Sequence, residues 1–126
     1  EYDIEEVRKM KISEIQIFDK STDVNSFEIE GESMWLDKST RVGLFNSISI
    51  EKNAGKSDTV LWYDAIKYII PISDALSMLN EIEMYALNCY NVTQSHIAAV
   101  KSLQTIEEIE NYDYTIGYPA KLSFPG

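Results

Sequence analysis

The chain has 126 residues, of which 44% are hydrophobic and 25% are charged, and its 11 basic and 21 acidic side chains give a net charge of −10. This size and composition are those of one globular domain. The negative charge repels nucleic-acid phosphates and anionic lipid, so we expect neither nucleic acid nor a membrane as a partner. No segment has the length and apolar character of a membrane span or of a signal peptide.

The first part of the chain predicts a helix and a loop. Asp3 and Glu6 resemble a capping box, and apolar residues then recur at helical spacing over residues 4–18. The polar run from Asp19 to Ser26 reads as a loop. The chain begins at Glu1 rather than methionine, as expected of a processed product or of one module of a longer polypeptide. We therefore expect one domain over residues 1–126, whose segment 1–20 can link to an upstream region or a partner.

Two hairpins and a helix are predicted next. Residues 27–30 and 33–36 alternate around Gly31, which indicates a short hairpin. Asp37 suits the N-cap of a helix over residues 39–52 that ends near Gly55, although Ile48-Ser49-Ile50 also fits a strand. A second hairpin follows over residues 59–63 and 66–70, and Pro71 ends its ladder.

The remainder is predicted to be mainly helical. Ser73 is expected to cap a helix that runs through Tyr90, and Asn91-Val92-Thr93 should introduce a kink or a new helix because Val and Thr have poor helix propensity. Thr105 and Glu108 form a capping box ahead of a short helix that ends near Asn111. The tail over residues 112–126 looks irregular. Its apolar side chains should fold back on the body, namely Tyr114, Ile116, Leu122 and Phe124.

Together these elements predict an α+β fold. We expect a small antiparallel sheet made of the two hairpins, packed against about four helices, with the irregular C-terminal tail folded onto the body.

Few side chains could perform catalysis. His96 is the only histidine and Cys89 the only cysteine, so a zinc site would lack ligands and no nucleophilic triad is evident. We expect Cys89 to be a buried thiol and His96 to be a surface or partly buried helix residue. Acidic residues that stand close together in the sequence could act as catalytic pairs, but solvated helix faces and helix N-termini explain them without catalysis. We therefore predict no catalytic residues, no cofactor, no metal and no small-molecule substrate.

Clusters of aromatic residues are the strongest indication in the sequence of a packing arrangement or a contact surface. Arg41 lies one turn after Asp37 and could pair with it or stack on Trp35, which would lock the first hairpin to the following helix. The same residue types also dominate binding hot spots, so an interface is the alternative, although we favour packing. The complete interface or packing signature comprises Trp35, Asp37, Arg41, Trp62, Tyr90, Tyr112, Tyr114 and Tyr118.

Four motifs in order carry a family resemblance. They are Met34–Arg41, Thr59–Trp62, Tyr85–Thr93 with His96, and Tyr112–Thr115 with Gly117–Pro119. Combined, they resemble a domain of unknown function found in bacteriophages and prophages, notably of gut Bacteroides-type bacteria. Relatives of that domain are attached to tail-fibre or tail-fibre-assembly proteins. The resemblance covers roughly residues 12–124.

The resemblance implies a non-enzymatic virion structural or adaptor module, associated with tail, fibre or head-fibre proteins. Its partners would be other phage structural proteins or further copies of the same chain. The protein would be made in the bacterial host cytoplasm and end in the virion. The alternative is a phage-encoded chaperone for fibre assembly or a small cytoplasmic regulator.

Overall fold

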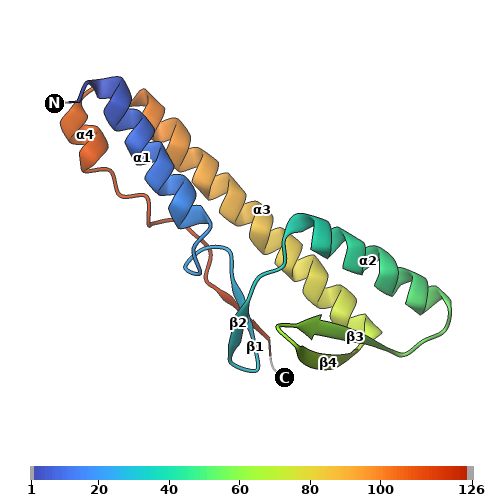
Figure 1. The fold of residues 1–126 in the computed structure, drawn as a ribbon. Coiled ribbons are helices and arrows are strands. Elements are labelled where there is room, and N and C mark those ends of the chain that lie inside the picture. Colours follow the sequence, from blue (N-terminus) through green and yellow to red (C-terminus); the bar gives the residue numbers. More distant parts are fainter. Residues whose placement is uncertain (1, 125–126) are drawn as a thin grey trace. The chain divides into compact units, whose positions relative to one another are not determined.

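The computed structural model describes residues 2–124. Within them, helices and strands follow one another as shown in Figure 1. The order is α1 (Ile4–Asp19), β1 (Phe27–Ile29), β2 (Glu32–Met34), α2 (Lys38–Asn53), β3 (Asp58–Tyr63), β4 (Ile66–Pro71), α3 (Ile72–Ser102), α4 (Ile106–Glu110) and β5 (Leu122–Phe124). The predicted α+β class is confirmed, as are both hairpins and the first two helices.

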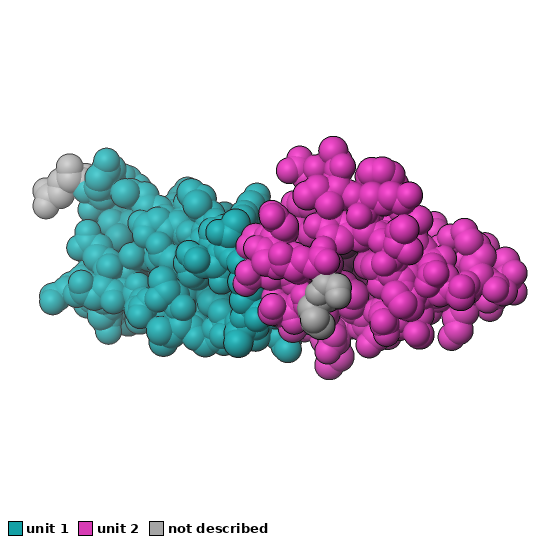
Figure 2. All heavy atoms as spheres, turned by 90° about the horizontal axis from the view of Figure 1, so that it is seen from below, with its two compact units in different colours: residues 1–26, 85–121 teal, residues 27–84, 122–126 magenta. Residues whose placement is uncertain are grey.

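The chain divides into two compact units, which Figure 2 colours separately. Unit 1 comprises residues 1–26 and 85–121, and unit 2 comprises residues 27–84 and 122–126. The division falls within α3, after Met84. The expectation of one domain over residues 1–126 stays a prediction.

Unit 1 is helical, and its helices α1 and α4 begin at the predicted N-caps. The Asp3 carboxylate accepts the backbone N–H of Glu6 at 2.9 Å, which satisfies one of the free donors at the start of α1. Thr105 and Glu108 form a reciprocal capping box at the start of α4. The core lies between α1, α3 and α4. Its buried members are Val7, Ile15, Val100 and Ile109.

Unit 2 contains two sheets, ordered β2-β1-β5 and β3-β4. The two predicted hairpins are present, but they lie in separate sheets rather than in the single antiparallel sheet we expected. The predicted irregular tail also supplies a strand, since β5 pairs in parallel with β1 and places Leu122 opposite Phe27. A parallel partner so distant in sequence has no turn to reveal it, so local patterns could not predict this pairing.

Both hairpin turns use two consecutive residues with positive φ, as in type I′ turns. They are Glu30 (φ 50°) and Gly31 (φ 82°) between β1 and β2, and Asp64 (φ 51°) and Ala65 (φ 64°) between β3 and β4. This geometry matches the right-handed twist of paired strands. A left-handed alanine is strained, and the six residue pairs of the β3–β4 ladder hold it in place.

Helix α3 differs from the prediction at two points. It begins at Ile72, directly after β4, so Ser73 lies inside the helix and is not its cap. It also continues without a break through Asn91-Val92-Thr93, where we expected a kink or a new helix. Thr93 is buried, and its hydroxyl is hydrogen-bonded within unit 1. Packing here outweighs the poor helix propensity of valine and threonine.

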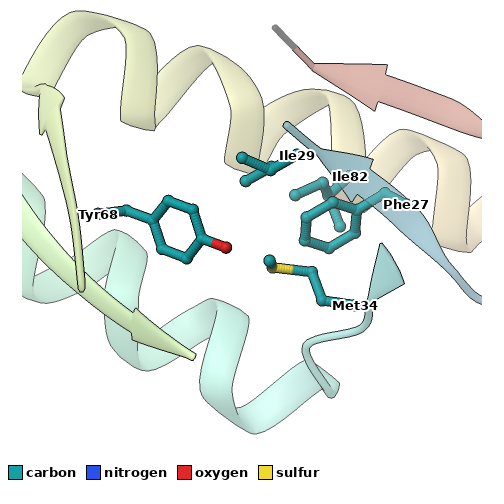
Figure 3. Close-up of a cluster of buried hydrophobic side chains, with 5 residues drawn as sticks. All are labelled: Phe27, Ile29, Met34, Tyr68 and Ile82. Carbon is teal, nitrogen blue, oxygen red and sulfur yellow. The ribbon is translucent and has the colours of Figure 1, made fainter. Parts of the chain in front are cut away.

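The core of unit 2 consists of two adjoining clusters. Figure 3 shows the first, in which side chains of β1, β2, β4 and α3 meet. The second lies between α2 and α3. The buried members are Phe27, Ile29, Met34, Tyr68 and Ile82 in the first cluster, and Ile48, Ile72, Ala75 and Leu79 in the second.

The C-terminal tail packs largely as predicted. Tyr114, Leu122 and Phe124 are half-buried, and the Phe124 ring lies edge-on to Phe27 with centroids 5.8 Å apart. Ile116 is the exception, because its side chain is exposed. The last two residues of the predicted tail, Pro125 and Gly126, lie outside the described residues.

Two glycines, one inside α2 and one just after it, should respond oppositely to substitution by alanine. A Cβ would meet no atom within 4 Å at either Gly43 or Gly55, but Gly43 is inside the helix and Gly55 has φ +86°. We expect Gly43→Ala to raise the free energy of unfolding by about 0.5–1 kcal/mol. Gly55→Ala should lower it by about 1 kcal/mol because of backbone strain. Urea unfolding measures both, and equal signs would contradict the assignment of these conformations.

Candidate functional site

Arg41, in the first turn of α2, is the centre of a polar cluster in unit 2. Its side chain is nearly buried, with 7% of its surface exposed. The guanidinium donates from Nε to Glu83 Oε2 at 2.8 Å and from Nη1 to the carbonyl oxygen of Leu36 at 2.6 Å. It also lies over the Trp35 ring, 5.2 Å from the ring centroid. Arg41 of α2 is therefore joined to α3 and to the segment between β2 and α2 through hydrogen bonds and cation–π stacking.

Asp37 has a separate role. It caps α2, because its carboxylate accepts the backbone N–H of Thr40 at 2.8 Å and the hydroxyl of Ser39 at 3.1 Å. These hydrogen bonds, led by the one from the Thr40 backbone, lower the pKa of Asp37. The predicted stacking of Arg41 on Trp35 is confirmed, whereas its carboxylate partner is Glu83 and not Asp37. Glu83 lies on a distant helix, so helical spacing could not reveal it.

The C-terminal tyrosines of unit 1 anchor the tail to α3 through His96. His96 Nε2 donates to the carbonyl oxygen of Ile116 at 2.8 Å, and its Nδ1 lies 2.6 Å from the Tyr112 hydroxyl. Both ring nitrogens are thus engaged by the tail. His96 is buried, so our expectation of a surface or partly buried position is wrong. The tail residues that bond its two ring nitrogens cover it.

Tyr118 also anchors the tail to α3, through Thr93, which lies one helical turn before His96. Thr93 donates its hydroxyl hydrogen to Asp19 at 2.7 Å, so the Tyr118 hydroxyl, 2.6 Å away, acts as donor to Thr93. The rings of Tyr114 and Tyr118 both pack edge-on against Phe18, with centroids 5.6 and 5.7 Å from it. Three of the predicted signature residues, Tyr112, Tyr114 and Tyr118, are therefore packing residues.

Cys89 is buried, as predicted. Its sulfur lies 3.8 Å from the carbonyl oxygen of Val24, which also accepts a hydrogen bond from the Tyr85 hydroxyl. Burial raises the pKa of the Cys89 thiol, which favours the protonated form. An activated cysteine nucleophile requires the opposite shift.

Trp62 and Tyr90 are the two aromatic signature residues that are exposed, with 64% and 59% of their surface accessible. Trp62 belongs to an apolar surface. In β3 and β4, alternate residues point away from the core, and the ladder pairs Val60 with Ile69 and Trp62 with Lys67. Val60 (45% exposed) and Ile69 (64%) lie beside Trp62 on this outward side. We call Val60, Trp62 and Ile69 the hairpin face.

Lys67 borders the hairpin face, with its ammonium 6.0 Å from the centroid of the Trp62 ring. The sequence marked Trp62 as an interface or packing residue. It did not identify the whole face, because the alternation of Val60, Trp62 and Ile69 becomes a surface only when the core side of the hairpin is known.

Neither a metal site nor a membrane span is found in the described part of the chain. No group of three or more histidine, cysteine, aspartate or glutamate side chains within residues 2–124 is placed to hold a metal ion. No helix among these residues has both the length and the apolar character needed to cross a membrane.

The Arg41 cluster should contribute to stability mainly through packing and through hydrogen bonds to the buried guanidinium. Glu83 is half exposed, so solvent screens its ion pair with Arg41. We expect Arg41→Ala to lower the free energy of unfolding by about 2–3 kcal/mol, and Glu83→Gln by less than about 1 kcal/mol. Denaturant unfolding provides the measurement. Equal costs for the two substitutions would show that the ion pair dominates.

Stability should also fall at alkaline pH. Burial raises the pKa of Tyr85, and also those of Tyr112, Tyr114 and Tyr118. The unfolded chain loses these protons near pH 10 while the folded protein retains them, so stability is complete below about pH 10 and is lost as pH rises further. We expect unfolding, followed by circular dichroism, to coincide with phenolate absorbance. Tyrosine ionisation well before unfolding would contradict this coupling.

No protein-family model, curated protein or solved structure matches this chain. The resemblance of the four motifs to a phage domain therefore stays a hypothesis. The contacts described above assign most of the aromatic signature to packing, and they leave the hairpin face as the strongest candidate for a functional site.

Proposed function

We propose that this protein is a non-enzymatic bacteriophage structural or adaptor module that docks onto another virion protein through the hairpin face. Two lines of argument support the proposal. The ordered motifs resemble a phage domain that carries no transferable catalytic residues, which suggests the class of protein. The exposed aromatic and aliphatic side chains of the β3–β4 hairpin suggest the mode of action.

The hairpin face is the observation that carries the proposal. Val60, Trp62 and Ile69 expose apolar area on neighbouring positions of a sheet whose other side covers the core. A single exposed apolar residue is common, but a contiguous group is more typical of a binding surface. Tryptophan is enriched among the residues that dominate binding energy. Burying Trp62 in a partner would therefore provide an anchor at little conformational cost, because the ladder already holds its backbone.

The packing of the chemically reactive residues agrees with a binding role. His96 uses both ring nitrogens to hold the tail, and Cys89 is enclosed beside the carbonyl oxygen of Val24. Substrate could reach neither group without displacing these contacts. Their positions are better suited to maintaining unit 1 than to carrying out a reaction.

The partner is expected to be a protein. With a net charge of −10, the chain would repel nucleic acid and anionic lipid. Another phage tail, fibre or head-fibre protein would supply an apolar pocket for Trp62, and a second copy of this chain is the other possibility. The site of action on this proposal is the virion.

Mass spectrometry of purified phage particles tests the proposal. We expect the chain to be present at a fixed ratio to the major capsid protein, and that ratio would indicate a capsid, ring or fibre position. Absence from mature particles would overturn the virion role. It would instead favour an assembly chaperone or a cytoplasmic regulator.

Substitution of Trp62 tests the docking surface separately. Trp62→Ser should reduce incorporation into particles at least about tenfold, since hot-spot truncations cost 2 kcal/mol or more. Ile17→Ser is the matched control, because Ile17 is as exposed (68%) but lies on α1 in unit 1. Both variants should remain folded by circular dichroism. Equal incorporation of the two variants would contradict a role for the hairpin face.

A further inference from the structure

Unit 2 contains an apolar cavity of about 250 Å³. Side chains from both of its sheets and both of its helices line this space, and nearly all of them are apolar. Figure 3 shows four of the lining residues, Phe27, Ile29, Met34 and Ile82, on the side that the Tyr68 ring faces. Some of the lining residues are exposed, so the space is a pocket that opens to the surface and that a small molecule can enter.

Tyr68, on β4, places a polar atom in this apolar space. Its side chain is only 9% exposed, and its hydroxyl points towards Met34 and Ile82 (Figure 3). Among residues 2–124, no side chain or backbone group forms a hydrogen bond with that hydroxyl, whereas the hydroxyls of Tyr85, Tyr112 and Tyr118 all have partners. The hydroxyl keeps some contact with solvent, because the buried side-chain polar atoms that lack a partner in the described residues are Arg8 Nε and Ser26 Oγ. Tyr68 can therefore exchange a water molecule for a polar atom of a ligand.

We propose that this cavity is a binding site for a small, neutral and mainly apolar organic molecule that forms one hydrogen bond with the Tyr68 hydroxyl. The cavity walls would bury the apolar part of the ligand, and its single polar atom would satisfy Tyr68. A cavity of 150 Å³ holds benzene, so by proportion this one has room for about ten non-hydrogen atoms. Suitable molecules are substituted phenols and medium-chain alcohols.

The charge around the cavity favours a neutral ligand. Burial is the main cause of the raised pKa of Tyr68, and the negative charges of Glu30 and Glu32 raise it further. The same two carboxylates would repel a fatty acid or another anion. Two residues of the hairpin face, Val60 and Trp62, also line this space, so the ligand site adjoins that face.

Two isosteric probes test the hydrogen bond. p-Cresol and p-xylene differ only by a hydroxyl in place of a methyl group, and both fit the estimated volume. We expect titration calorimetry to show that both bind the wild-type chain. Tyr68→Phe should weaken p-cresol binding by about three- to tenfold and leave p-xylene binding unchanged, because only p-cresol loses a hydrogen bond. Tyr63→Phe is the matched control, since Tyr63 also lines the cavity, and it should change neither affinity.

One further variant and one further measurement complete the test. Ala75→Leu adds bulk to a buried lining residue and should abolish binding of both probes. Without any ligand, Tyr68→Phe should unfold close to the wild-type temperature, because no hydrogen bond within the described residues is lost. Failure of both probes to bind, an unchanged probe ratio in Tyr68→Phe, or a lower unfolding temperature for that variant would each overturn the proposal.

Discussion

The packing of one face of helix α3 is the constraint on which the described structure depends. Each of the buried hydrophobic clusters contains at least one side chain from this helix. Its buried residues recur at intervals of three or four, which keeps them on one face. They are Ile72, Ala75, Leu79, Ile82, Tyr85, Cys89, Thr93, His96 and Val100. Loss of helical register would therefore disturb the core of either unit.

Polar residues on that face determine how the aromatic residues are used. Thr93 and His96 occupy positions that an apolar residue would normally take, and each receives a tyrosine hydroxyl from the C-terminal tail. Arg41 plays the equivalent part in unit 2, where Glu83 of α3 is its partner. Most of the aromatic signature is thereby used in packing. Of its two aromatic residues that stay exposed, Trp62 lies beside Val60 and Ile69 and is therefore the better candidate for contact with another protein.

Local chemistry explains which features could be predicted from sequence. The caps at Asp3, Asp37 and Thr105 and the turn at Gly31 act within a few residues, so they were visible in the chain. The parallel pairing of β5 with β1 joins residues that are distant in sequence. The ion pair between Arg41 and Glu83 does so as well. The continuity of α3 through Thr93 depends on burial that propensity does not report. The cavity beside Tyr68 likewise had no sequence signal.

The central claim is that the hairpin face of unit 2 is the surface through which this protein docks. Hydroxyl-radical footprinting of the isolated chain and of intact phage particles tests it directly, because it reports the accessibility of each aromatic side chain. We predict that Trp62 is oxidised in the isolated chain and protected in particles, while Tyr90 is oxidised similarly in both. Equal oxidation of Trp62 in the two samples would contradict it.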